Sequence, residues 1–237
     1  MGKNLIQQRR GRGTLRFRAP NHRFVGEAGY TRIDLGNTKG TVRDIRHCAA
    51  HSAPLLDVAF ENGERIFMIS ADEKKVGSDV NIGDNAPVES GNVLALKSIP
   101  DGTEIFNIES SPGDGGKFAR SGGNFARVIA KREDFVTIML PSKKERKFSP
   151  NCRATIGRVA AGGRLEKPLL KAGNAYYKMT ARNRFWPNVC GQSMNAVAHP
   201  HGGKRSSKKN YSLCVPRSAP PGAKVGKISP RKTGKKR

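Results

Sequence analysis

The most constraining feature of this 237-residue sequence is the division of its charge into blocks. Residues 34–116 contain 7 basic and 14 acidic residues, whereas residues 167–237 contain 17 basic residues and no acidic residue. Residues 1–33 and 117–166 are also basic, at +7 and +8, and the whole chain reaches +25. Because like charges repel within a compact body, the basic ends predict extensions that are ordered against a polyanion. The candidate partners are nucleic acid, an acidic membrane surface and an acidic protein.

The interior of the chain has the pattern of two small β-domains. With 27 Gly, 14 Pro and 36% hydrophobic residues, the composition favours two small cores over one large core. In residues 34–91, short alternating runs flank Asn62-Gly63, which predicts a hairpin and an oligonucleotide-binding (OB) type of barrel. In residues 92–166, further short runs predict a second small barrel of about five or six strands. The predicted fold class is therefore mainly β, with basic extensions over residues 1–33 and 167–237.

The expected strands can be placed by their alternation and by the turns between them. They cover residues 41–47, 55–60, 65–70, 76–83, 92–96, 103–108, 126–131, 135–140 and 154–159. Residues 141–147 are expected to form a polar turn. After Gly163 the β pattern fades, so residues 167–237 are predicted to be a binding extension without regular structure.

Both extensions combine cations with aromatic residues. Arg-Gly alternation around Gly11 gives a flexible backbone whose guanidinium groups can stack on bases and bind phosphates. Between residues 171 and 186, Tyr176, Tyr177, Phe185 and Trp186 fit two interpretations: the last core residues of the second barrel, or stacking platforms for unpaired bases. We expect the segment to divide these roles, with some aromatic residues packing and the cations binding.

Residues 194–204, with the sequence MNAVAHPHGGK, are predicted to form a loop. Pro200 restricts the backbone on both sides of its peptide bond, and the two glycines that follow allow a phosphate backbone to approach closely. Histidine is the usual general base, but no Asp or Glu lies within thirty residues of His199 to orient its ring. Hydrogen bonding to phosphate or ribose is the favoured role for these histidines, and catalysis by His199 is the alternative.

Metal and membrane sites are not predicted. The four cysteines form no Cys-x-x-Cys pair, and the spacing of His47, Cys48 and His51 matches no zinc pattern. The N-terminus has no apolar signal-peptide core, and no apolar run approaches the ~20 residues of a membrane span. We therefore expect a soluble, intracellular protein with reduced thiols.

Residues 193–204 closely resemble the loop of a universal family of large-subunit ribosomal proteins, the L2 family. The family pattern is Met-Asn-Pro-Val-x-His-Pro-x-Gly-Gly-Gly, and here Ala196 replaces the proline and Lys204 the third glycine. The similarity extends to residues 112–124, 140–142, 167–173 and 221–226, and so covers nearly the whole chain. The short arm before Gly11 and the run at residues 171–178 resemble the archaeal and eukaryotic branch.

The resemblance implies an OB-type barrel followed by an SH3-like barrel, with both ends extended into large-subunit (23S-type) rRNA. It implies a structural, non-enzymatic role in the cytoplasmic ribosome, in subunit assembly and association, near the peptidyl-transferase region. Large-subunit rRNA and neighbouring ribosomal proteins are the implied partners, with no membrane, small-molecule substrate or second copy of the chain. No cofactor is expected, although Mg²⁺ or monovalent ions can bridge such an interface. A single-stranded nucleic-acid binder acting outside the ribosome is a further alternative.

The residues expected to bind rRNA come from the N-terminal arm, the glycine-rich loop near residue 117, the aromatic segment and the histidine loop. His199 occupies the position of the family histidine once proposed to assist peptide-bond formation. No catalytic and no metal-binding residue is predicted. The full set is Arg9, Arg10, Arg12, Arg16, Arg18, His22, Arg23, Lys117, Arg120, Lys171, Lys178, Arg182, Arg184, Trp186, Asn195, His199, His201, Gly202, Gly203, Lys204 and Arg205.

Overall fold

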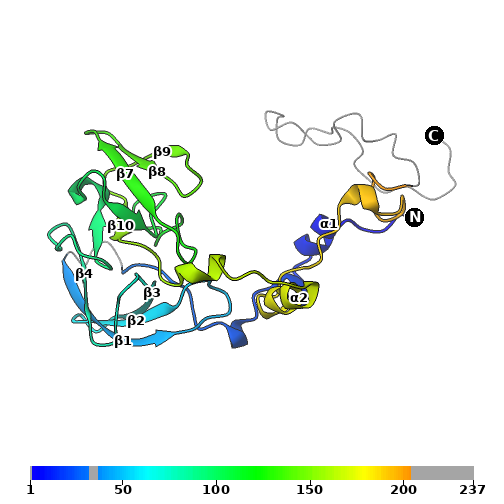
Figure 1. The fold of residues 1–237 in the computed structure, drawn as a ribbon, viewed down its shortest axis with the longest axis horizontal. Helices are drawn as coiled ribbons and strands as arrows, with labels where there is room; N and C mark the ends of the chain where they lie inside the picture. Colours follow the sequence, from blue (N-terminus) through cyan, green and yellow to red (C-terminus); the bar gives the residue numbers. More distant parts are fainter. Residues whose placement is uncertain (1, 32–36, 204–237) are drawn as a thin grey trace. The chain divides into compact units, whose positions relative to one another are not determined.

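The computed structural model describes residues 2–31 and 37–203, which belong to two compact units. Residues 21–170 form the β-unit, which contains all the strands of the described residues. The described residues 2–20 and 171–203 belong to the extension unit, which contains the helices α1 (Ile6–Gly11) and α2 (Ala172–Ala181). Figure 1 shows the strands of the β-unit and the two helices.

The β-unit is built on one continuous sheet with the strand order β3-β2-β1-β4-β5-β10-β6-β7-β8-β9. Neighbouring strands are antiparallel except β4 and β5, which are parallel and meet at the single pair Ile82 and Val93. Short 3₁₀ helices of the described residues lie at Leu15–Phe17, Asn21–Arg23, Leu96–Ser98, Gly162–Leu165 and Gly191–Ser193. The strands are β1 (Thr38–Arg46), β2 (Leu55–Phe60), β3 (Arg65–Ile69), β4 (Asp79–Ile82), β5 (Val93–Ala95), β6 (Glu104–Phe106), β7 (Ala126–Lys131), β8 (Val136–Met139), β9 (Glu145–Phe148) and β10 (Arg153–Ile156).

Turn chemistry explains the connection between β2 and β3. Gly63 has a φ of +85°, a conformation that glycine adopts without a steric penalty, and Asn62 Oδ1 accepts a hydrogen bond from the Glu64 amide at 3.0 Å. The hairpin predicted at Asn62-Gly63 is therefore confirmed as the β2–β3 connection. The predicted mainly β fold class is also confirmed.

Three clusters of buried side chains form the core of the β-unit. One lies under β1 to β4, includes Val58 and Val80, and extends to Val93 of β5. Another lies under β5 to β10 and includes Ile105 and Ile138. The third, which includes Phe106, contains side chains from both halves of the sheet. The two halves thus have separate cores that a third cluster joins.

Residues before the sheet cover one of its edges. Ala28 pairs with Phe67 of the edge strand β3, and the Gly29 amide donates to the Phe67 carbonyl at 3.0 Å. A Cβ added at Gly26 would lie 2.8 Å from the Phe67 ring, so only glycine fits at this approach. Residues 26–29 therefore act as a short cover on β3.

Two sequence expectations were wrong. Residues 145–148 form the edge strand β9 rather than part of a polar turn, because only Phe148 of this strand is buried and its charged neighbours hide the alternation. Residues 172–181 form α2, whereas no regular structure was expected there. Ala172, Ala175 and Ala181 favour a helix, but α2 has no buried residue and so lacks the apolar stripe that signals one. No helix within residues 2–31 and 37–203 is long and apolar enough to cross a bilayer.

Candidate nucleic-acid interface

The extension unit carries positive charge without any acidic side chain to balance it. Residues 2–20 and 171–203 contain ten Lys and Arg residues and no Asp or Glu. The β-unit differs, since it pairs cations with carboxylates, as in Lys39 with Asp79 at 2.9 Å and Lys97 with Asp84 at 2.6 Å. A surface with this composition attracts polyanions, and the attraction weakens as salt increases.

The end of α2 is set by Asn183. This residue has a φ of +50°, and its amide donates to the Thr180 carbonyl at 3.0 Å. The Arg184 amide donates to the Met179 carbonyl at 2.9 Å. This pair of hydrogen bonds is the Schellman motif, in which glycine or asparagine takes the left-handed position just beyond the helix. Asn183 therefore ends α2 and turns the chain toward Phe185 and Trp186.

The same asparagine holds the N-terminal arm. Its Nδ2 donates to the Leu15 carbonyl at 3.0 Å and to the Arg18 carbonyl at 2.6 Å. These bonds bracket the 3₁₀ turn at Leu15–Phe17 and bring the Phe17 ring to 6.5 Å from the Phe185 ring. Residues that are more than 160 positions apart in the sequence thus build one surface.

The aromatic residues of this unit take two positions. Phe185 faces the arm, and the Arg16 guanidinium lies 5.9 Å from its ring centre. Tyr176 and Tyr177 pack edge to face at 5.6 Å and are 49% and 72% exposed. These tyrosines therefore do not complete a protein core. Exposed aromatic faces next to cations can stack on unpaired bases and on neighbouring guanidinium groups.

The histidine loop is organised around a pair of imidazoles. The His201 amide donates to His199 Nδ1 at 3.1 Å, and the two rings lie 4.8 Å apart. Burial lowers the pKa of His199 below its ordinary value, and the charge of His201 lowers it further. A Cβ at Gly191 would lie 2.4 Å from the His199 ring. Because His199 Nδ1 accepts the hydrogen bond from the His201 amide, neutral His199 carries its proton on Nε2. Nε2 is therefore a hydrogen-bond donor at neutral pH.

Backbone hydrogen bonds close this loop. The Gly202 amide donates to the His199 carbonyl at 2.9 Å, and the Gly203 amide donates to the Met194 carbonyl at 3.1 Å. A Cβ at Gly202 would lie 2.3 Å from the Asn195 carbonyl oxygen, so this position requires glycine. The arm also contacts the loop, because the Lys3 amide donates to the Val197 carbonyl at 2.8 Å. The glycines that were predicted to allow a close approach of RNA therefore also allow the close backbone packing within this loop.

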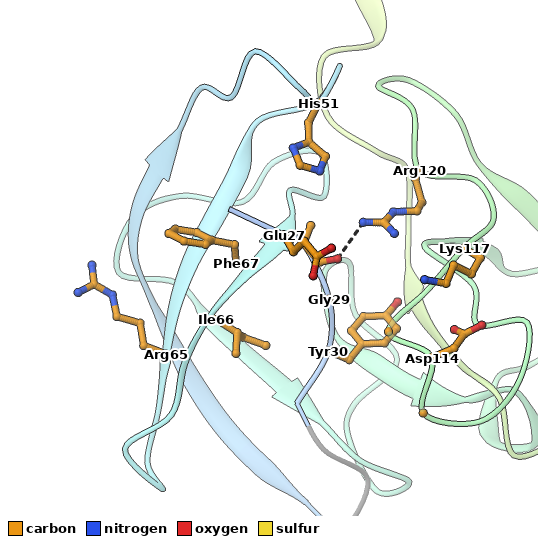
Figure 2. A pocket seen from close by; sticks show the side chains of 13 residues that line it. Glu27, Gly29, Tyr30, His51, Arg65, Ile66, Phe67, Asp114, Lys117 and Arg120 are labelled. Atoms are coloured by element: carbon orange, nitrogen blue, oxygen red, sulfur yellow. Dashed lines mark hydrogen bonds between the residues drawn. The ribbon is translucent and has the colours of Figure 1, made fainter. Parts of the chain in front are cut away.

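The β-unit contributes a second set of predicted residues. Arg120 donates to the Gly116 carbonyl at 2.7 Å and to the Ala28 carbonyl at 2.8 Å, so it fastens residues 26–30 to the glycine-rich loop. Arg120, Lys117 and Glu27 line a cavity of about 700 Å³. Figure 2 shows these side chains around the cavity. The cavity thus mixes cations with carboxylates, unlike the extension unit.

The structure therefore places the predicted residues in two groups. His22, Arg23, Lys117 and Arg120 belong to the β-unit, and Lys204 and Arg205 lie outside the described residues. Within the described ranges no three His, Cys, Asp or Glu residues gather in a way that could hold a metal ion. The extension unit brings together Arg9, Arg10, Arg12, Arg16, Arg18, Lys171, Lys178, Arg182, Arg184, Trp186, Asn195, His199, His201, Gly202 and Gly203.

Sequence reasoning missed Asn183 and Phe17 as the residues that join the two ends of the chain. The available signal was an asparagine shortly after Lys178, Met179, Ala181 and Arg182, which favour a helix, at a position where a helix commonly ends. It was overlooked because α2 itself was not predicted. The contact between Asn183 and the arm has no local signal, since its partners are backbone carbonyls.

Comparison with known proteins gives matches over the whole chain. The family described as Ribosomal Proteins L2, C-terminal domain, matches residues 89–220. The large ribosomal subunit protein uL2 of Haloarcula marismortui is 45% identical over 236 residues, which cover 99% of this chain and 98% of the relative. The large ribosomal subunit protein uL2 of Archaeoglobus fulgidus is 44% identical over 237 residues, covering all of both chains.

Proposed function

Because the chain belongs to the L2 family of ribosomal proteins, we propose that it is a structural constituent of the large ribosomal subunit that binds large-subunit rRNA. The observation that carries this proposal is the extension unit, with ten cations and no carboxylate side chain over residues 2–20 and 171–203. A surface of this kind gains free energy by releasing the counterions condensed on RNA. A folded sheet with its own ion pairs does not require such a partner.

The two units have different tasks in this proposal. The β-unit is an OB-type barrel over residues 34–91 followed by an SH3-like barrel over residues 92–166, and the separate cores under the two halves of the sheet support that division. It acts as a rigid anchor. The extension unit enters crowded rRNA near the peptidyl-transferase region, where it neutralises phosphates and supports subunit assembly and association.

The histidine loop has a positioning role in this scheme. Neutral His199 offers its Nε2 proton to a phosphate or ribose oxygen, while Nδ1 is occupied by the His201 amide. With no carboxylate in the described extension unit to stabilise an imidazolium, general-base catalysis lacks its usual second residue.

In this proposal the protein is a structural component of a cytoplasmic ribosome, with rRNA and neighbouring ribosomal proteins as its partners. Mg²⁺ or monovalent ions can bridge the interface.

A salt titration tests the electrostatic part of the proposal. Each phosphate contact contributes about 0.7–0.9 to the slope of log affinity against log salt, so replacing Arg12, Arg16 and Arg18 together with Gln lowers the slope by about 2–3. The matched control replaces three cations of the β-unit that are paired with Asp, namely Lys39, Arg46 and Lys97. Filter binding to purified large-subunit rRNA measures both. Equal slopes for the two triple variants would contradict the proposal.

Truncation tests whether the β-unit and the extension unit have separate roles. A chain that ends at Gly173 retains every strand of the described residues, and we expect its β-unit to fold. It lacks α2 and the histidine loop, so we expect it not to be incorporated stably into large subunits. The measurement is co-sedimentation with large subunits at high salt. A single-stranded nucleic-acid binder that acts outside the ribosome would dissociate under these conditions, so the same assay tests that alternative. Normal incorporation of the truncated chain would refute the assigned role of the extension.

A further inference from the structure

The extension unit contains a cavity of about 520 Å³ that is built from both ends of the chain. Phe17 comes from the N-terminal arm, whereas Phe185 and Trp186 follow α2. The cavity exists because Asn183 fastens the arm beside the end of the helix, as described above. Its volume falls within the range of about 300–1,000 Å³ typical of small-molecule sites. Aromatic rings therefore line a hollow that neither end of the chain can form alone.

Polar groups complete the walls. Arg10 and Arg184 bring positive charge, and Asn188 brings an amide that can both donate and accept hydrogen bonds. No Asp or Glu lines this cavity. Its lining thus provides flat apolar faces, hydrogen-bonding groups for a polar edge, and cations for a negatively charged backbone.

We propose that this cavity binds one unstacked nucleobase of RNA, with Trp186 as its stacking platform. The inference rests on the proposed function and adds a defined base-binding site to it. An unpaired base presents a π face to an aromatic ring and donors and acceptors at its edge, while its flanking phosphates require cations nearby. An apolar side chain of a neighbouring protein would use the rings but would leave the two arginines without a partner.

The single tryptophan of the chain provides a direct readout. A base that stacks on Trp186 quenches its fluorescence, whereas a phosphate backbone held by distant arginines does not. The full-length protein is titrated at low salt with oligouridylate, at a length of about ten nucleotides to match common single-strand site sizes. Uracil bases stack little on one another, so they need little unstacking before they bind. An abasic oligomer with the same ribose-phosphate backbone is the matched ligand.

Variants then separate the cavity from the general basic surface. Removing a stacking aromatic weakens binding by roughly 5- to 150-fold per base, so Trp186→Ala is expected to reduce oligouridylate affinity to that of the abasic oligomer. Trp186→Phe keeps an aromatic face and is expected to retain most of the affinity; filter binding measures both Trp186 variants, because they lack the fluorescent reporter. Phe17→Ala keeps the reporter and tests the wall supplied by the arm. Tyr177→Ala removes an exposed aromatic residue outside the cavity, so it can weaken overall binding but is expected to leave the quenching at saturating oligouridylate unchanged.

The outcomes distinguish this inference from the function on which it rests. Quenching by oligouridylate alone, together with its loss in Phe17→Ala, supports the base site. Equal affinity for both oligomers without quenching would overturn the base site and leave rRNA binding intact. Failure of both oligomers to bind at low salt would overturn the RNA-binding function itself, and the base site with it.

Discussion

Replacing Glu109 of the β-unit should cost substantial stability. Its side chain is fully buried, and its carboxylate accepts hydrogen bonds from Arg153 Nη2 at 2.8 Å and from the Arg153 amide at 2.9 Å. It also accepts one from the Gly115 amide at 3.2 Å. Arg153 in turn donates to the Thr31 carbonyl at 2.8 Å and lies 5.2 Å from the Tyr30 ring centre. One buried carboxylate thus supports β10, the glycine-rich loop and the segment before the sheet.

The expected cost of Glu109→Gln follows from that burial. Breaking a buried ion pair by removing one partner costs about 3–5 kcal/mol, because the remaining charge is left without compensation. Glutamine keeps the shape and part of the hydrogen bonding, so we expect a loss of about 3 kcal/mol in the free energy of unfolding. Glu104→Gln is the matched control. Glu104 is bound by Arg127 and Arg158, whose side chains are about half exposed, so its loss should cost at most about 1 kcal/mol.

Urea unfolding followed by far-ultraviolet circular dichroism measures both variants. Trp186 fluorescence is unsuitable here because that residue belongs to the extension unit. A loss of less than about 1 kcal/mol for Glu109→Gln, equal to that of the exposed control, would refute the argument from burial.

Three further predictions concern the extension unit. Asn183→Gly keeps the left-handed helix end but removes the two bonds to the arm, so trypsin should cleave the arm faster while α2 persists; Asn183→Ala should also fray α2. Gly202→Ala should disrupt the histidine loop, because the added Cβ would collide with the Asn195 carbonyl oxygen. Gly163→Ala is the control, because its added Cβ would contact no atom, and amide NMR spectra of the two variants would show the difference. Because the pKa of His199 is lowered in the folded loop, the loop should be most stable above the ordinary histidine pKa and should lose stability as pH falls through the folded value. A proton NMR titration in which His199 titrates at or above an exposed histidine would contradict this last prediction.

Much of the β-unit could be predicted from sequence, because its strands show local signals. The hairpin at Asn62-Gly63 needs a residue that tolerates positive φ, and β2 and β7 were predicted with their observed bounds. The strand β9 was missed because an edge strand with three exposed charged residues has no alternation of polarity to detect. The signal was therefore strongest where an apolar or alternating run is bounded by turn residues, as in β2 and β7.

The candidate site was only partly predictable. Charge counts place cations in both extensions, since a run of Arg and Lys is visible without any knowledge of the fold. That Phe17 lies near Phe185 could not be foreseen, because contacts of high sequence separation depend on the path of the chain. The link between them is a side-chain amide bonded to two main-chain carbonyls, which leaves no trace in composition or spacing.

The cover that residues 26–29 place on β3 matters for the solubility of the protein on its own. An open sheet edge is a template on which another chain can add a strand and start aggregation. Here the edge at β3 is occupied by the Ala28 and Gly29 backbone, and the opposite edge, β9, presents Glu145, Arg146 and Lys147 to solvent. A chain with a net charge of +25 and two protected sheet edges is therefore guarded against edge-to-edge association with other copies.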